Sequence, residues 1–233
     1  MKDPLGKAIQ AYLQKPDKKA EIVVHSKLCE DDVIPVPYLF RKYADFPEIE
    51  KIALTHCQGK ILDVGAGAGA HALYLSEKGF DIHAIDISEL AVEHLKNNGI
   101  SAQMINFFDL QAEKYDTILM LMNGIGIAGT LANLENTLLK AYQLLNENGC
   151  VIVDSSDIRY LYEEEDGSIW LDLNAAYYGD FDYQMEYKGE IGEWFQWLFV
   201  DFENMKKTAE KVGFEVELLY QNEEQYLVKL KKL

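Results

Sequence analysis

Basic residues are scarce in this sequence. Its 22 lysines and arginines stand against 39 aspartates and glutamates, which gives a formal net charge of −17. The longest basic cluster is the short run at 229–232. A chain with this charge is repelled by phosphate backbones, so we expect no nucleic-acid partner.

Cysteines and long apolar runs are scarce too. Cys29, Cys57 and Cys150 are odd in number and have no metal-binding spacing, so we expect reduced thiols and no metal site. No apolar run approaches the roughly 20 residues of a membrane span, and the first residues lack the apolar core of a signal segment. We therefore expect a soluble, cytoplasmic protein with no membrane partner. A chain of 233 residues suffices for one α/β domain with a small addition.

The segment 60–69 predicts a short buried strand that runs into a glycine loop and then into a helix at 70–78. Gly65, Gly67 and Gly69 stand at alternate positions, where the missing Cβ lets the backbone pass close under a ligand. The free amides at the start of the helix would then face a polar or anionic group. This pattern indicates a nucleotide-type ligand.

Two ligands of that type compete for such a loop. A dinucleotide-binding loop prefers glycine at its sixth place, which here is Ala70, a substitution that the motif tolerates. Asp63 lies just before the loop, where a carboxylate would repel a pyrophosphate and would suit a ligand with a cationic amine. We therefore favour the cationic ligand.

Strands and helices alternate from residue 60 to residue 154. We expect strands at 60–64, 81–86, 102–106, 117–122 and 149–154, and helices at 69–78, 88–98 and 131–145. This alternation predicts a doubly wound, mostly parallel sheet with helices on both faces, whose ligands bind beyond the carboxyl ends of the strands. The polar residues that end these strands, or follow them directly, are Asp63, Asp86, Asn106, Asn123 and Asp154.

These segments, in this order, resemble the class I S-adenosylmethionine-dependent methyltransferases, with a Rossmann-like sheet of seven strands and an antiparallel last strand. The resemblance implies that Asp86 binds the ribose hydroxyls and that Ile87 lies against the adenine. It places Asn106 and Phe107 at the adenine edge, with Asn106 in place of the family's usual aspartate, and Asn123 beside the methyl group. The cofactor would be S-adenosyl-L-methionine, and the loop residues that bind it would be Asp63, Gly65, Ala66, Gly67 and Gly69.

Two segments lie outside this alternation. Residues 1–59 predict an N-terminal cap on a methyltransferase domain at 60–233, and the resemblance suggests that this cap folds over the cofactor. Arg41 would then pair with the cofactor's carboxylate or with a substrate acid, or else lie solvated along the cap. The aromatic-rich insertion at about 155–200 predicts an antiparallel hairpin, which either covers the acceptor or forms a homodimer interface. A helix at 202–212 and strands near 214–220 and 225–231 follow.

Methyl transfer needs alignment of two reactants more than acid–base chemistry, so the lack of an obvious catalytic triad fits this interpretation. The candidates for a catalytic role are His71, Asn123 and Asp154. We predict a methyltransferase that acts on a small molecule. Two alternatives remain: an NAD(P)-dependent oxidoreductase on a similar sheet, and a non-catalytic protein that binds S-adenosylmethionine.

Overall fold

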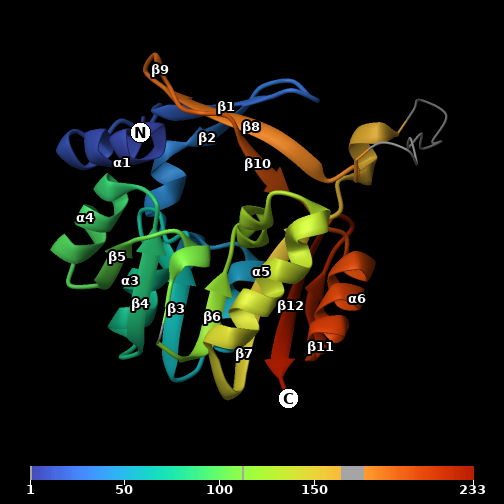
Figure 1. Ribbon diagram of the computed structural model, residues 1–233. Helices are drawn as coiled ribbons and strands as arrows, with labels where there is room; N and C mark the ends of the chain where they lie inside the picture. The colour runs from blue at the N-terminus through green and yellow to red at the C-terminus, as the bar shows by residue number, and fades with distance from the viewer. Residues whose placement is uncertain (1, 112, 164–175) are drawn as a thin grey trace.

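A computed structural model describes residues 2–111, 113–163 and 176–233, and its main body is a seven-stranded sheet (Figure 1). The strand order is β11-β12-β7-β6-β3-β4-β5. Their bounds are β3 Lys60–Val64, β4 Asp81–Asp86, β5 Ser101–Met104, β6 Tyr115–Met120, β7 Leu145–Ser156, β11 Phe214–Gln221 and β12 Gln225–Lys232. In this described sheet β12 pairs antiparallel with both β11 and β7 and so runs opposite to the other six strands, which confirms the expected antiparallel last strand.

Helices cover both faces of this sheet, as the alternating pattern predicts. One face packs on α2, α3 and α4, and the other packs on α5 and α6. Their bounds are α2 Glu48–Thr55, α3 Ala70–Glu77, α4 Glu89–Asn97, α5 Leu131–Leu144 and α6 Phe202–Val212. The helix ends follow local signals: Ser88 caps α4 by accepting a hydrogen bond from the Ala91 amide, and Gly213 ends α6 in a left-handed conformation.

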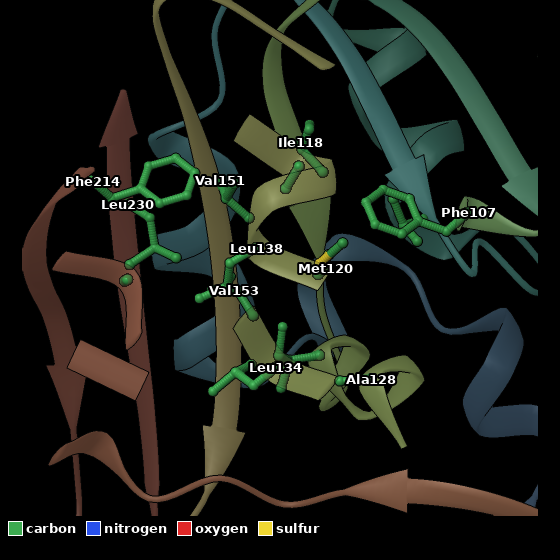
Figure 2. Close-up of a cluster of buried hydrophobic side chains, with 14 of the residues drawn as sticks. Phe107, Ile118, Met120, Ala128, Leu134, Leu138, Val151, Val153, Phe214 and Leu230 are labelled. Carbon is green, nitrogen blue, oxygen red and sulfur yellow. The ribbon is translucent and has the colours of Figure 1, made fainter. Parts of the chain in front are cut away.

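The larger core lies between the sheet and α5 and α6. Figure 2 shows Leu134 and Leu138 of α5 lying against strand residues such as Val151 and Val153. All four side chains have no exposed surface. Burial of this kind, about 1.5–3 kcal/mol for each large aliphatic side chain, holds the strand ends in fixed positions. The site described below is therefore built on rigid elements.

The N-terminal segment and the insertion pair with each other in a second, antiparallel sheet. Its strand order is β10-β8-β1-β2, and the short β9 pairs with β8. The bounds are α1 Pro4–Gln14, β1 Glu21–Ser26, β2 Asp32–Pro35, β8 Asp180–Tyr187, β9 Glu190–Ile191 and β10 Phe195–Leu198. The expected hairpin is thus present as β8 and β10, and β1 extends it. Residues 164–175 of the predicted insertion lie outside the described residues.

The second sheet lies across the edge of the main sheet at which the parallel strands end (Figure 1). Helix α1 packs beside it and against α4. Short 3-10 turns fill the connections, with bounds η1 Val36–Phe40, η2 Tyr43–Asp45, η3 Phe107–Asp109, η4 Gly124–Ala128 and η5 Arg159–Tyr162. In the described ranges, no helix is long and apolar enough to cross a membrane.

Candidate active site

The glycine loop joins β3 to α3 at the carboxyl edge of the main sheet. Gly65 and Gly67 have φ values of +70° and +52°, and a Cβ added at either would meet no atom within 4 Å. Their missing side chains therefore leave open space above the loop. A Cβ on Gly69 would come within 2.4 Å of Leu95 in α4, so this third glycine permits close packing of loop and helix.

Backbone hydrogen bonds hold the loop against β4. The amides of Gly65 and Ala66 both donate to the Ile85 carbonyl, at 2.9 and 3.1 Å. The Gly67 amide donates to Oδ2 of Asp86 at 2.8 Å. The structure thus brings the predicted glycine loop and the predicted ribose acid together. These hydrogen bonds within the protein fix the shape of the loop.

Asp63 is a buried carboxylate at the start of the loop. Its side chain is 3 % exposed, and among the described residues its Oδ2 has no hydrogen-bond partner. Burial raises the pKa of Asp63 to about 6, and the charge of His71 only partly opposes this. An orphaned buried acceptor is costly, so it indicates a donor that arrives with a ligand. A cationic amine meets that need.

Asp86 ends β4 beside the loop. Its Oδ1 accepts from the Ser88 amide at 2.8 Å, and its Oδ2 accepts from Gly67. Burial raises the pKa of Asp86, while these two amide donors lower it. Each carboxylate oxygen has a second lone pair, so the pair of oxygens can still accept from two hydroxyls.

The expected adenine side presents two exposed apolar side chains. Ile87 is 67 % exposed and Phe108 is 36 % exposed, so apolar surface is available there. The ring of Phe107, a residue that the resemblance places at the adenine edge, lies in the large core (Figure 2). Asn106 uses its Oδ1 to accept from the Phe108 amide at 3.0 Å, which caps η3. Phe108 is therefore the exposed aromatic ring at this edge.

Arg41 belongs to a buried polar cluster that the sequence did not reveal. Its guanidinium donates to both the Tyr38 carbonyl, at 2.7 Å, and Oε1 of Glu50. The other Glu50 oxygen, Oε2, lies 2.8 Å from Nε2 of His71. Arg41 also lies over the Tyr38 ring, 3.8 Å from its centroid. Arg41 is therefore not a solvated surface residue. The sequence did not single out Glu50, because a glutamate in an amphipathic helix is usually an exposed charge.

Asp154 lies near the carboxyl end of β7 and is 7 % exposed. Its Oδ1 accepts from the Asn123 amide at 3.1 Å, and no hydrogen bond within the described residues reaches its Oδ2. Burial raises the pKa of Asp154 to about 7, with the nearby Glu50 charge adding to the rise. This carboxylate is therefore poised to exchange a proton near neutral pH.

Asn123 connects the main sheet to the second sheet. It and Met122 have φ values of +57° and +60°, which are uncommon for residues other than glycine and mark a sharp bend after β6. The Asn123 side chain donates to the Leu198 carbonyl at 3.0 Å and accepts from Ser155 at 2.8 Å. Ser155 in turn accepts from the Val200 amide at 3.1 Å. The amide group of Asn123 is thus used to fix the end of β10.

The strand register places the aromatic side chains of the hairpin on one face. Tyr183 pairs with Phe195, and Phe181 pairs with Trp197, so all four share a face of the second sheet. The Trp197 ring lies 2.1 Å from the position of a Cβ on Gly126, in η4. This face therefore packs toward the carboxyl edge of the main sheet.

The opposite face of the second sheet is polar. Asp182 pairs with Lys27 there, and Glu186 lies 3.1 Å from His25. Trp194, which stands just before β10, is 43 % exposed and carries Lys27 over its ring. The strand register favours an aromatic face that covers the carboxyl edge of the main sheet. A homodimer through this hairpin stays a prediction.

The arrangement fits S-adenosylmethionine at this edge. The open space above Gly65 and Gly67 allows a ligand to lie close to the backbone of the loop. The orphaned oxygen of Asp63 suits its ammonium group, and the exposed apolar surface of Ile87 and Phe108 suits an adenine ring. Within the described residues, no group of three or more His, Cys, Asp or Glu side chains is placed to hold a metal ion. Fold and site together define a class I methyltransferase.

Comparisons with known proteins agree with this class. Residues 7–219 match the family described as "Methyltransferase domain". A crystal structure of a SAM-dependent methyltransferase from Bacteroides fragilis, in complex with S-adenosyl-L-homocysteine, is 43% identical. It superposes with a TM-score of 0.91 over 100% of this chain and 96% of that one. The chain therefore belongs to the S-adenosylmethionine-dependent methyltransferases, an enzyme family whose cofactor is S-adenosyl-L-methionine, and the nicotinamide alternative is set aside.

Curated relatives are more distant and differ in their acceptors. A glycine/sarcosine N-methyltransferase from Aphanothece halophytica is 25% identical, over 47% of this chain and 44% of the relative. A 23S rRNA (uracil(747)-C(5))-methyltransferase from Pyrococcus horikoshii is 27% identical, over 46% of this chain and 31% of the relative. The chain thus spans about half or less of the length of the curated relatives it matches. Their names leave the class of acceptor open.

Ligand-dependent stability gives a direct check on the cofactor. A ligand that binds only the folded state adds about 2.7 kcal/mol at a hundredfold excess over its dissociation constant. We expect S-adenosylmethionine and S-adenosylhomocysteine to raise the melting temperature and NADH and NADPH to leave it unchanged. Differential scanning fluorimetry measures this. A rise with the nicotinamides alone would contradict the cofactor assignment.

Proposed function

We propose that this enzyme transfers the methyl group of S-adenosylmethionine to a small-molecule acceptor held between the carboxyl edge and the second sheet. The observation that carries the proposal is the inward aromatic face of the hairpin, which covers the edge where the family's chemistry takes place. A covered site suits a small acceptor better than an extended macromolecule. The net charge of −17 also disfavours a nucleic-acid acceptor.

In this proposal the glycine loop and two carboxylates bind the cofactor. Gly65, Ala66, Gly67 and Gly69 let it approach the backbone, Asp63 pairs with its ammonium group, and Asp86 accepts from its ribose hydroxyls. When bound, the cofactor supplies a methyl group on a positively charged sulfur, which is open to displacement. The three side chains that complete the site at its adenine and carboxylate ends are Ile87, Phe108 and Arg41.

Asp154 is the candidate that best suits proton removal from the acceptor. The Asn123 side chain is used in fixing β10, and Nε2 of His71 is used on Glu50. Oδ2 of Asp154 has no hydrogen-bond partner among the described residues. Burial raises the pKa of Asp154 to about 7, which is close to the pKa of an efficient base at neutral pH. As the acceptor atom bonds to the methyl carbon, the carbon–sulfur bond would break with its electrons left on sulfur, giving S-adenosylhomocysteine, and the N–H or O–H proton of the acceptor would pass to Oδ2. Alignment of the reactants at this edge would supply about 7–11 kcal/mol.

The acceptor class is tested by transfer of a labelled methyl group. The protein is incubated with radiolabelled S-adenosylmethionine and with a cell extract separated into a dialysable fraction and a retained fraction of protein and RNA. We expect label in the dialysable fraction only. Label in retained RNA or protein would overturn the small-molecule proposal and leave the family assignment untouched.

The aromatic face can be tested with a matched pair of variants. Tyr183 lies on the inward face, whereas Trp194 is exposed with Lys27 over its ring. We expect Tyr183→Ala to lower kcat/KM for the acceptor by about tenfold, because it removes one aromatic contact. The affinity for S-adenosylhomocysteine should stay the same. Trp194→Ala serves as the control and should change neither quantity; equal losses in the two variants would contradict the assigned face.

A further inference from the structure

Glu50 is a carboxylate on the buried face of α2, and the function described so far does not use it. It is 4 % exposed and stands among the apolar residues that pack this helix on the sheet. Glutamate is almost never fully buried unless it is paired. Both of its oxygens are paired here, with Arg41 on Oε1 and His71 on Oε2. The position therefore serves these two partners rather than the core.

The pairing keeps Glu50 ionised. Burial raises the pKa of its carboxyl, but the hydrogen bonds and charges of His71 and Arg41 outweigh burial and hold the pKa below its usual value. A carboxylate only accepts hydrogen bonds, so Nε2 of His71 carries a hydrogen and the ring's orientation is set. No described residue forms a hydrogen bond with its Nδ1, and His71 stands two residues beyond the last glycine of the loop.

Arg41 is held from three sides. Its guanidinium donates to Glu50 and to the Tyr38 carbonyl and lies over the Tyr38 ring. Its Nε is fully buried and has no partner among the described residues. A buried donor without an acceptor indicates an acceptor that arrives with a ligand. The charged end nearest the start of α3 in the proposed complex is the amino-acid end of the cofactor.

We propose that Glu50 is a positioning residue for the amino-acid end of S-adenosylmethionine. One oxygen orients Arg41 and the other orients His71, so that both face the α-carboxylate and α-ammonium groups above the glycine loop. Glu50 does not touch the cofactor and acts through its two partners. This inference rests on the cofactor placement given under the proposed function.

The test compares two ligands that share adenosine and differ at the amino-acid end. S-adenosylhomocysteine has the α-carboxylate and α-ammonium groups, and 5′-methylthioadenosine has neither. We expect Glu50→Gln to weaken the binding of S-adenosylhomocysteine by about tenfold or more, because Arg41 and His71 lose the carboxylate that orients them. The affinity for 5′-methylthioadenosine should change by less than about twofold. Isothermal titration calorimetry measures both.

Two further variants make the result decisive. Glu48→Gln, an exposed residue of the same helix, should change neither affinity. Arg41→Lys keeps the positive charge but cannot hold the same contacts, so it should reproduce the loss for S-adenosylhomocysteine alone. If Glu50→Gln does not fold, Glu50→Asp, which keeps the charge on a shorter side chain, should show the same selective loss. Equal loss for both ligands, or loss for neither, would overturn the role of Glu50. Failure of the cofactor placement itself would show instead as an Asp86→Ala variant that binds both ligands like the wild type.

Discussion

Asp154→Asn should lower methyl-transfer turnover by a factor of about 10²–10⁴, the usual contribution of a general base. The side chain keeps its shape and can still accept from the Asn123 amide, but it can no longer take the acceptor's proton. Affinity for S-adenosylhomocysteine should stay within about threefold of the wild type. Single-turnover kinetics and calorimetry measure the two quantities. Asp182→Asn, on the polar outer face of the second sheet, is the control for the substitution itself.

The dependence of kcat/KM on pH in the wild type should also show the role of Asp154. Asp154 must be ionised to act as a base, so kcat/KM should rise as the pH rises through about 7, where burial has placed its pKa. In Asp154→Asn this rise should be absent. A variant that keeps wild-type turnover, or one that keeps the same pH profile, would show that Asp154 is not the base.

Without ligand, the free energy of unfolding of the wild type should fall as the pH rises, whereas kcat/KM should rise. The folded state holds the Asp154 proton up to about pH 7, whereas an unfolded chain releases it near pH 4, so ionisation of Asp154 lowers the free energy of unfolding as the pH rises between these values. Asparagine carries no charge and avoids this penalty. We expect Asp154→Asn to be more stable than the wild type by about 2–4 kcal/mol at pH 8 and nearly equal at pH 4. Chemical unfolding at the two pH values measures it.

Asp86→Ala should weaken both S-adenosylmethionine and S-adenosylhomocysteine by about 2 kcal/mol or more, which is roughly thirtyfold. The ribose hydroxyls would lose a charged acceptor, and the amides of Gly67 and Ser88 would lose theirs. The variant should therefore also lose stability. Asp86→Asn retains an acceptor oxygen and should lose less. Calorimetric titration gives the affinities.

A matched control lies on the same strand. Asp81 is the exposed first residue of β4, at the far end from the loop, so Asp81→Ala should bind both ligands like the wild type. Folding of each variant is checked by circular dichroism. If Asp86→Ala folds and retains full affinity for both ligands, the ribose site is placed on the wrong residue.

The main sheet was largely predictable because its signals are local. The apolar run before the glycine loop, the alternation of strands with helices and the caps at Ser88 and Gly213 each act within a few residues of chain. The first predicted strand and the last predicted helix match β3 and α6 at both ends, at 60–64 and 202–212. Parallel strands end at one edge, so the polar residues at those ends were brought together as expected.

The direction of individual side chains was less predictable. Phe107 and Phe108 are chemically alike, and only the geometry of η3 sends the first ring into the core and leaves the second exposed. Asn123 stands at the expected place, but its amide group fixes β10 through Leu198. A resemblance in sequence assigns positions, whereas the orientation of a side chain depends on the neighbours that surround it.

The sequence by itself determined the order of strands and helices, the glycine loop and the carboxylates at the strand ends, because periodicity and backbone preferences are properties of short segments. The tertiary structure alone decided that β1 pairs with β8, and that Glu50 joins Arg41 to His71. These partners are far apart in the chain or lie on different elements. Pairing between distant segments depends on loop closure and on packing across the whole fold, and a buried charge is recognised only when its partners are seen.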